Sequence, residues 1–324
     1  MKCWLSAIPM AIALSATTAH AQESYPSRAI TIIVPNPPGG MNQITAQPLS
    51  AVIEKISKQP APVINKPGGT AAVGTAYVAN QKPDGYNILV TTPNLYLVVE
   101  KNKAQNTESP YKLEQIQPIA LTSADPLILT VQTESPYKSV KEFIADAKAK
   151  DGQLAYSSSG PFGVTHVPFA VFAQTVGIRM RHVPTTGGGP AVTQLLGGHV
   201  QATGQGLAAV APHIKGGKLR PLASWGAKRH SGLPDVPTFR ELGQDLEAYL
   251  WVGLFTTAGT PEPTLRAVRD LMRRAINDPA YQQAMQNANV EIDYRDTPEF
   301  LKFFQADYKR LGPAVASLAK DEKK

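Results

Sequence analysis

Two glycine-rich turns contain the residues that could bind a small anion. The first, residues 34–43, reads Val-Pro-Asn-Pro-Pro-Gly-Gly-Met-Asn-Gln and follows the apolar run 30–34. Its prolines fix φ and lack N–H donors, so the turn is stiff, and Gly39 and Gly40 let the backbone approach a ligand closely. A strand, this turn and a helix N-terminus would present free amides and a positive dipole end to a carboxylate or phosphate. The alternative is a buried strand that ends in an ordinary Pro-Gly loop.

The second turn has the same design. Strand-like residues 154–156 lead into Ser157-Ser158-Ser159-Gly160-Pro161-Phe162-Gly163, and a helical pattern begins at Thr165. Three hydroxyls and several amides would form another anion cradle, although serine and threonine are also ordinary N-caps. Two such turns predict one site, because ligands of open α/β sheets bind beyond the strand ends. The turns 91–94 and 184–189 are further candidates.

Catalytic and metal-binding patterns are weak. Ser157–Ser159 and His166 could supply a nucleophile and a base, but the signature Gly-x-Ser-x-Gly is absent. We expect His166, in the first turn of a helix, to shape the loop instead. The later histidines show no metal-ligand spacing, and the glycine turns match neither a phosphate loop nor a dinucleotide fingerprint. The sequence therefore predicts a site that holds an anion without transforming it, with no enzyme activity, no cofactor and no metal.

Alternating strand-like and helix-like segments must position these turns. Apolar runs predict strands at 30–34, 86–90, 127–131, 154–157, 181–183, 201–203, 219–224 and 252–256. Helical spacing predicts helices at 44–57, 165–176 and 191–196. Pro48 should confine or kink the first turn of helix 44–57.

Three further helix starts have capping signals. Ser139 and Glu142 form a capping box, Thr260 precedes Pro261 at a first helical position, and Thr297-Pro298 opens the last helix. The alternation predicts an α/β fold with mostly parallel sheets flanked by helices.

No Pro/Ser-rich hinge divides the chain, so we expect two interleaved domains rather than domains in series. Interleaved domains need short crossing strands, and residues 119–129 and 221–225 are the candidates.

The first 21 residues have the pattern of a secretory signal. Met1-Lys2 is a short basic region, residues 4–16 are apolar, and Ala19-His20-Ala21 is a small-x-small cleavage pattern. Cleavage would make Gln22 the mature N-terminus. No run reaches the roughly 18 apolar residues that a membrane-spanning helix needs. We expect an exported, soluble, periplasmic protein. Because Cys3 is the only cysteine and lies within the signal, the mature chain would contain no cysteine.

Composition is that of an ordinary globular protein. The 324 residues are 43% hydrophobic and 18% charged, and the formal net charge is +7. Basic residues are scattered, and no basic stripe interleaved with aromatic residues indicates nucleic-acid binding. A mild positive field would help to gather anions.

The chain resembles the Bug-type periplasmic solute receptors, the TctC-like component of tripartite tricarboxylate transport systems. The matching segments run through almost the whole mature length. They are Tyr25-Pro-Ser27, Val34-Pro-Asn-Pro-Pro-Gly-Gly40, Asn65-Lys-Pro-Gly68, Pro83-Asp-Gly-Tyr86, Tyr156-Ser-Ser-Ser-Gly160 with His166, His182-Val-Pro184, Leu195-Leu-Gly-Gly198, Pro212-His213, Gly217-Lys-Leu-Arg220, Leu233-Pro-Asp-Val-Pro-Thr238 and Ala258-Gly-Thr-Pro261.

The resemblance implies a two-lobed periplasmic binding protein of type II-like architecture that closes on a small carboxylate. Residues 22–123 and 226–324 would form lobe 1, and residues 124–225 lobe 2. It further implies a monomer that serves the permease subunits of a tripartite transporter, without nucleic-acid partners. The alternative is a periplasmic sensor of the same fold that passes occupancy to a signalling partner. The expected ligand-binding residues are Asn36, Pro38, Gly39, Gly40, Asn42, Gln43, Thr92, Ser158, Ser159, Phe162, Thr165, His166, Thr185 and Gln205.

Departures from the family pattern bear on ligand charge. The family usually has an aromatic residue where this chain has Asn36, and often has Asp at the positions of Gln43 and Gln205. Two neutral amides argue against an ammonium-bearing ligand and for a dianion. Met41, Phe162 and the third glycine turn could leave room for an apolar body. An aromatic dicarboxylate such as terephthalate is then as well supported as an aliphatic di- or tricarboxylate.

Overall fold

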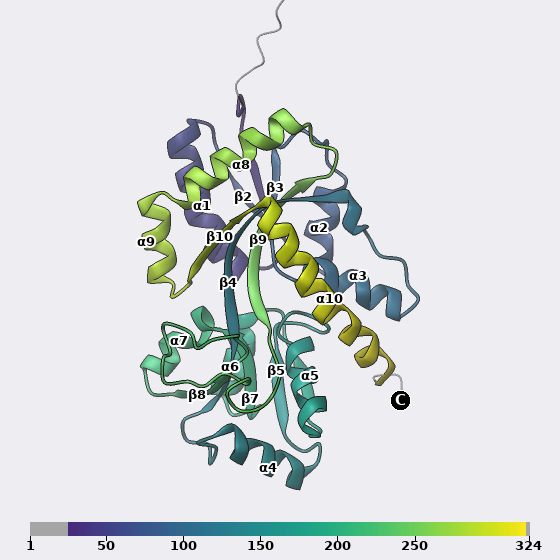
Figure 1. Cartoon of the computed structure of the whole chain (residues 1–324), viewed down its shortest axis with the longest axis vertical. Coiled ribbons are helices and arrows are strands. Elements are labelled where there is room, and N and C mark those ends of the chain that lie inside the picture. The colour runs from purple at the N-terminus through teal and green to yellow at the C-terminus, as the bar shows by residue number, and fades with distance from the viewer. Residues whose placement is uncertain (1–24, 322–324) are drawn as a thin grey trace, which may run out of the picture.

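The computed structural model describes residues 25–321, which form two α/β lobes joined by long strands (Figure 1). The strands are β1 (Thr31–Val34), β2 (Val63–Asn65), β3 (Asn87–Thr91), β4 (Ile116–Gln132), β5 (Ala155–Ser158), β6 (Arg181–Pro184), β7 (Ala202–Gly206), β8 (Leu219–Ser224), β9 (Tyr249–Thr257) and β10 (Ile292–Asp296). The helices are α1 (Met41–Ser57), α2 (Ala72–Ala79), α3 (Asn94–Ala104), α4 (Val140–Lys150), α5 (Val167–Val176), α6 (Gly188–Leu196), α7 (Leu207–Lys215), α8 (Glu262–Ile276), α9 (Pro279–Asn287), α10 (Thr297–Asp321) and the short 3₁₀ turn η1 (Leu113–Gln115).

The strands form one continuous mixed sheet in the order β2-β1-β3-β9-β4-β7-β5-β6, with β8 and β10 also pairing with β4. The outer strands of each lobe pair in parallel, as predicted: β1 with β2 and β3, and β5 with β6 and β7. The central pairings of β4 and β9 are antiparallel. The expectation of mostly parallel sheets is therefore wrong at the centre, where strands that cross between the lobes run in opposite directions.

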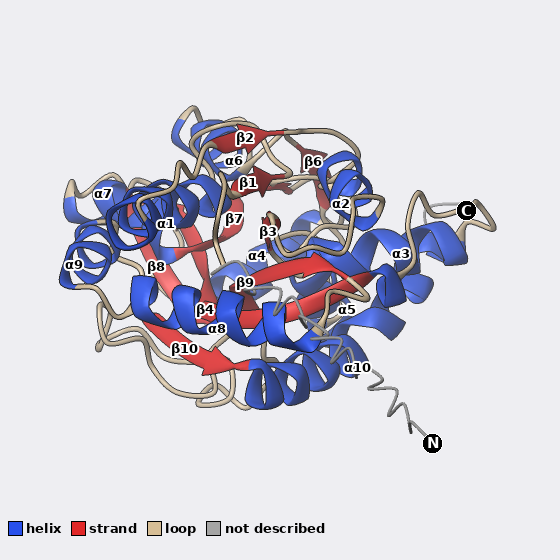
Figure 2. Cartoon of the chain, turned by 90° about the horizontal axis from the view of Figure 1, so that it is seen from above, coloured by secondary structure: helices blue, strands red, loops and turns tan. Residues whose placement is uncertain are grey.

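Helices cover both faces of the sheet in each lobe. In the first lobe, α1, α8 and α9 share one core with the strands, and α2, α3 and α10 share the core on the opposite face. In the second lobe, α4 and α5 cover one face, and α6 and α7 cover the other. Seen from above, α8 runs across β4, with α1 and α9 to the left of the view and α10 to the lower right (Figure 2).

Side-chain alternation along the strands explains these layers. In β1, Ile33 packs into one core of the first lobe, whereas Ile32 and Val34 pack into the core on the other face. In β4, Leu129 and Ile128 divide in the same way between the two cores of the second lobe. A strand buried on both faces reads as a continuous apolar run, as these segments do.

The two strands that cross between the lobes are β4 and β9. The prediction of a crossing at 119–129 is confirmed, because β4 pairs with strands of both lobes. The second predicted crossing, 221–225, is wrong: it lies at the end of β8, which pairs with the distal part of β4. The partner of β4 between the lobes is β9, which pairs with it from Ile116↔Thr257 to Pro126↔Tyr249 with two register shifts.

The segment between β8 and β9 packs with the second lobe. Phe239 and Leu246 lie in the same core as Trp225, and the indole of Trp225 is 4.6 Å from the ring of Phe239, measured between centroids. We therefore propose that the second lobe extends to residue 248 rather than to residue 225.

Two helix starts differ from the sequence expectation. Helix α1 begins at Met41 and continues through Pro48, because Leu49, Val52 and Ile53 anchor it in the core. Thr260 does not cap α8; its hydroxyl donates to the carbonyl of Thr257, and Pro261 is the N-cap. Ser139 does cap α4, as predicted, by accepting from the amide of Glu142 at 3.2 Å.

The predicted secretory signal lies outside the described residues. Within residues 25–321, no helix combines the length and apolar character needed to cross a bilayer.

Candidate functional site

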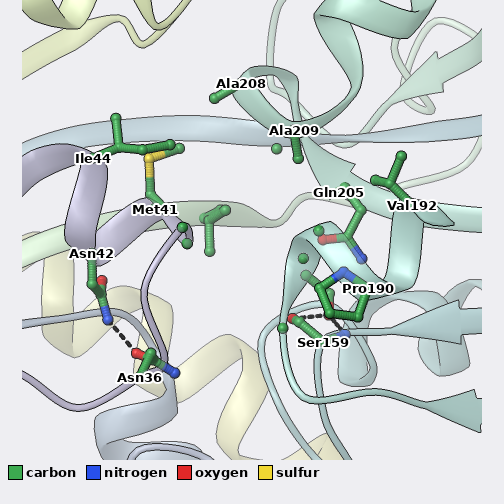
Figure 3. A pocket seen from close by; sticks show the side chains of 18 of the residues that line it. Asn36, Met41, Asn42, Ile44, Ser159, Pro190, Val192, Gln205, Ala208 and Ala209 are labelled. Carbon is green, nitrogen blue, oxygen red and sulfur yellow. Dashed lines mark hydrogen bonds between the residues drawn. The ribbon is translucent and has the colours of Figure 1, made fainter. Parts of the chain in front are cut away.

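A cavity of about 500 Å³ lies between the lobes, where strands of both lobes lead into helices. Its wall includes residues from the turns β1–α1, β3–α3, β6–α6 and β7–α7 and from the loop after β5. Figure 3 shows Asn36, Met41, Asn42 and Ile44 on one side, and Ser159, Pro190, Val192 and Gln205 on the other. The cavity is thus at the strand ends, where α/β sheets bind ligands.

The β1–α1 turn brings an uncapped helix N-terminus to the cavity. Gly39 has a φ of +90°, which only glycine adopts readily, and Gly40 is the N-cap of α1 without a side-chain cap. A Cβ at either glycine would meet nothing within 4 Å, so their backbone faces open space. The side-chain amide nitrogen of Asn42 donates to the side-chain oxygen of Asn36 at 2.6 Å and braces the turn.

Three more helix N-termini at the cavity have no side-chain cap. These are the starts of α3, α6 and α7, with N-caps Pro93, Gly187 and Gly206. The first amides of a helix have no intrahelical partner, and the helix dipole favours a negative charge beside them. Four such termini, two from each lobe, make the cavity attractive to anions from both sides.

The cavity wall is poor in ionisable side chains. Among the described residues that line it, none is Asp, Glu, Lys or Arg, and His213 is the only histidine. An anion would be stabilised by amides and helix dipoles rather than by a counter-ion. An ammonium group would find no carboxylate here.

Polar side chains add hydrogen-bonding capacity at specific points. Thr165 accepts from the amide of Ser159 at 2.8 Å, and the two hydroxyls are 2.6 Å apart. Gln205 donates to the hydroxyl of Thr203 at 3.2 Å. The hydroxyl of Thr92 and the side-chain oxygen of Asn42 are buried without a protein partner. Buried polar atoms normally find a partner, so a ligand or water at this wall would satisfy them.

An apolar surface completes the cavity. It is formed by Met41, Ile44, Val164, Val192, Leu196, Ala208, Ala209 and Leu250. On α6 the lining residues Val192, Thr193 and Leu196 recur at helical spacing, so the cavity runs along this helix beyond its N-terminus. A ligand with an apolar body would fit this surface.

Nine of the fourteen sequence-predicted site residues line the cavity. They are Asn36, Pro38, Gly39, Gly40, Asn42, Thr92, Ser159, Thr165 and Gln205. The other five are not on its wall; they are Gln43, Ser158, Phe162, His166 and Thr185.

Each of these five side chains is engaged elsewhere. The side-chain oxygen of Gln43 accepts from Asn65 at 2.8 Å. The hydroxyl of Thr185 donates to the carbonyl oxygens of Ser158 and Gly187. Phe162, only 3% exposed, packs into the core beneath α3 and α10.

The remaining two, Ser158 and His166, belong to a cluster that contains a pair of stacked imidazoles. The rings of His166 and His182 are parallel, with centroids 3.7 Å apart. His166 accepts from the amide of Phe162 at 2.8 Å, and His182 lies 2.7 Å from the hydroxyl of Ser158. Burial lowers the pKa of His166 to about 3, helped by the neighbouring His182, and lowers the pKa of His182 to about 4. Both rings are therefore neutral at pH 7, and together they support the loop that carries Ser159 and Thr165.

Sequence reasoning missed several residues of the cavity wall. Asn94 lines it and is 7% exposed, whereas the sequence predicts only Thr92 from the candidate turn 91–94. From the third glycine turn the sequence predicts only Thr185 at the site, whereas the wall contains Thr186 to Pro190. A helix-dipole argument applied to every strand-to-helix turn would have found these residues.

A polar cluster lies away from this cavity. Asp125, His230 and Glu291 place ligand-type atoms within 4.8 Å of one another, a proximity that the sequence spacing did not predict. The amide of Gly232 donates to Nδ1 of His230 at 2.9 Å, which leaves the ring proton on Nε2, facing Asp125 Oδ1 at 3.4 Å. That nitrogen is then a hydrogen-bond donor rather than a metal ligand.

Comparisons with known proteins agree on one family. The profile of the "Tripartite tricarboxylate transporter family receptor" matches residues 45–319. BugT of Bordetella pertussis is 32% identical over 268 residues, which cover 82% of this chain and 80% of BugT. A TctC solute binding protein from Polaromonas, solved without ligand, is 29% identical with a TM-score of 0.72, covering 90% of this chain and 99% of that one. The periplasmic binding protein BugD is 26% identical with a TM-score of 0.79, covering 92% and 98%.

Proposed function

Because the chain belongs to the tripartite tricarboxylate transporter receptor family, we propose that it captures a small dicarboxylate between its lobes and delivers it to a tripartite membrane transporter. The observation that carries this proposal is the wall of the cavity. It combines four uncapped helix N-termini with an absence of Asp, Glu, Lys and Arg side chains among its described residues. The resemblance to Bug-type receptors in the sequence is confirmed at the level of the family.

The arrangement of donors favours two anionic groups on one ligand. Helices α1 and α3 belong to one lobe, and α6 and α7 to the other, so each lobe can hold one carboxylate. A ligand that contacts both lobes stabilises the closed form. Two proteins of the same fold from Rhodopseudomonas palustris, each 24% identical to this chain, were solved with malate and with adipate. Both compounds are dicarboxylates.

The apolar wall extends the proposal to the body of the ligand. Met41 and Ile44 face the cavity from α1, and Val192 faces it from α6 (Figure 3). A flexible chain such as that of adipate or a ring such as that of terephthalate would bury apolar surface there. This burial is worth about 25 cal/mol per Å².

We propose no catalytic role. Ser158 and His182 are within hydrogen-bonding distance, as a nucleophile and its base would be, but Ser158 is fully buried and off the cavity wall. Its hydroxyl donates to the carbonyl of Gly160 at 3.0 Å, which fixes the turn. The pair is thus better suited to support the loop than to attack a substrate.

Localisation and partners follow from the same proposal. The signal pattern before Gln22 would export the chain to the periplasm, where a monomer would meet the permease subunits. A chain that begins at Gln22 contains no cysteine and therefore needs no oxidative folding.

A thermal-shift screen tests the proposal. Binding to the native state raises Tm by mass action, and a ligand at 100 times its Kd should raise it by about 5 °C. We expect linear and aromatic dicarboxylates to do so, and matched monocarboxylates and amino acids to do so much less. The proposal fails if no dicarboxylate stabilises the protein, or if amino acids stabilise it equally well.

A cavity-filling variant tests whether the ligand-induced rise in Tm comes from binding in this cavity. Ala209→Phe places a ring inside the cavity, whereas Ala145→Phe adds the same ring to an exposed position of α4. The first should remove the ligand-induced shift and the second should keep it. Equal shifts in both variants would place the ligand outside this cavity.

A further inference from the structure

We propose that Asn94 couples ligand binding to lobe closure, an inference that rests on the proposed function. Asn94 is the first residue of α3 in the first lobe. Its side-chain oxygen accepts from the backbone amide of Val164, which belongs to the β5–α5 loop of the second lobe, at 2.9 Å. The bond is buried: Asn94 is 7% exposed and Val164 is 2% exposed. Both residues also line the ligand cavity.

The surroundings of this bond are an apolar contact between the lobes. Phe162, Val164 and Val167 of the second lobe lie in the same core as Leu95 and Leu97 of α3. Leu318 of α10 packs into that core as well. Opening the lobes at this point would expose Phe162 and Val164 and leave the Val164 amide without Asn94, so the contact favours the closed form.

The other cross-lobe hydrogen bond nearby is weaker. The hydroxyl of Thr70 donates to the carbonyl of Pro161 at 3.4 Å in an exposed position. Thr70 does not line the cavity. An exposed, long hydrogen bond contributes little to closure and cannot sense a ligand directly.

The other half of the Asn94 amide is available to a ligand, because Asn94 lines the cavity. Its oxygen is used by Val164, and no hydrogen bond of the described residues uses its NH₂ group. That group can donate to a ligand carboxylate while the oxygen holds the other lobe. A single planar amide would then contact ligand and second lobe together, and each contact would orient it for the other. This geometry makes binding and closure mutually favourable.

Two substitutions test the oxygen and the NH₂ group of the Asn94 amide separately. Asn94→Asp keeps an oxygen for Val164 but replaces the NH₂ donor with an acceptor and a negative charge. Asn94→Ala removes both. The matched pair Asn80→Asp and Asn80→Ala makes the same changes at an exposed position of the same lobe.

Spin labels can measure closure directly, because a chain from Gln22 has no native cysteine. Ala51→Cys on α1 and Ala149→Cys on α4 are exposed positions, one on each lobe. Electron–electron double resonance would give the distance distribution between them, without ligand and with adipate or terephthalate. Calorimetry would give Kd for the same two compounds, and melting curves would show that each variant is folded.

We expect Asn94→Ala to shift the ligand-free distribution to longer distances and to weaken binding at least tenfold. Asn94→Asp should keep the ligand-free distribution of the wild type and still weaken binding at least tenfold. The Asn80 variants should change neither quantity. Coupling is refuted if Asn94→Ala leaves the ligand-free distribution unchanged, or if Asn94→Asp binds like the wild type.

Failure of the proposed function would look different. If the wild type bound no dicarboxylate, the proposed function would be refuted. The ligand-free distance distributions would still show whether Asn94 holds the lobes together.

Discussion

Replacing Gln205 by glutamate should convert a cavity for dianions into one that rejects them. Gln205 is 2% exposed, lies on β7 and points into the cavity (Figure 3). A Cβ at Gly188, at the start of α6, would lie 3.2 Å from the side-chain oxygen of Gln205. Glutamate has the same shape and would place its charge beside the N-termini that we assign to a carboxylate.

The size of the effect follows from Coulomb's law. Two unit charges about 5 Å apart at an effective dielectric constant of about 20 repel by about 3 kcal/mol, which is a factor of more than 100 in Kd. The repulsion also raises the pKa of the new carboxyl group when the ligand is bound. Lower pH should therefore restore binding to Gln205→Glu more than it changes binding to the wild type.

The assay is a paired calorimetric titration with adipate and 2-aminoadipate from pH 5 to pH 8. Gln205→Met is the neutral control, and it should lose only about 1 kcal/mol for the missing amide hydrogen bond. The wild type should prefer the diacid, because an ammonium beside neutral amides loses water without gaining a counter-charge. If Gln205→Glu binds adipate as tightly as the wild type, or if its deficit does not change with pH, Gln205 does not sense ligand charge.

Three further predictions concern the loops around the cavity. Folding lowers the pKa values of His166 and His182 from their ordinary value of 6.5, so below that pH the unfolded state binds more protons than the folded state. Stability should therefore decrease as pH falls toward 4. His182→Phe keeps the stacked ring and should flatten this slope in urea unfolding by up to about 1.4 kcal/mol per pH unit, whereas an unchanged slope would exclude His182 as its source. Gly39→Ala should cost about 1 kcal/mol in the same assay, because Gly39 has a positive φ. Gly40→Ala should cost less: a Cβ has open space at both glycines, so only the backbone strain differs. Equal costs would contradict the strain argument. Thr165→Val leaves the partly buried amide of Ser159 without its acceptor and should cost about 1–3 kcal/mol of unfolding free energy; an unchanged stability would show that water replaces the hydroxyl.

The sequence predicted the strand-to-helix turns well because their signals are local. Apolar runs located β1, β3, β5 and β8 to within about a residue, and the glycines after β1 marked a turn that does reach the cavity. Local patterns could not show that β4 runs unbroken through both lobes past Pro118 and Pro126, where pairing with β9 holds it extended. They also could not place the return crossing, because the loop of Phe239 is held in the second lobe by contacts distant in sequence.

Side-chain direction within a turn was harder to predict than the turn itself. Ser158 and Ser159 are neighbours with the same chemistry, yet only Ser159 lines the cavity. Ser158 is turned toward His182 on β6, a partner 24 residues away. Gln43 is likewise held by Asn65. Tertiary hydrogen bonds decide these orientations, and one sequence does not reveal them.

The most direct test of the account is a crystal structure with the dicarboxylate that stabilises the protein most. The account predicts one carboxylate within hydrogen-bonding distance of the backbone amides at the start of α1 or α3, and the other at the start of α6 or α7. The ligand body should contact Met41 or Val192, with no Lys or Arg side chain at either carboxylate. A ligand bound outside this cavity, or carboxylates held by basic side chains, would contradict the claim that helix N-termini in a neutral cavity recognise the anion.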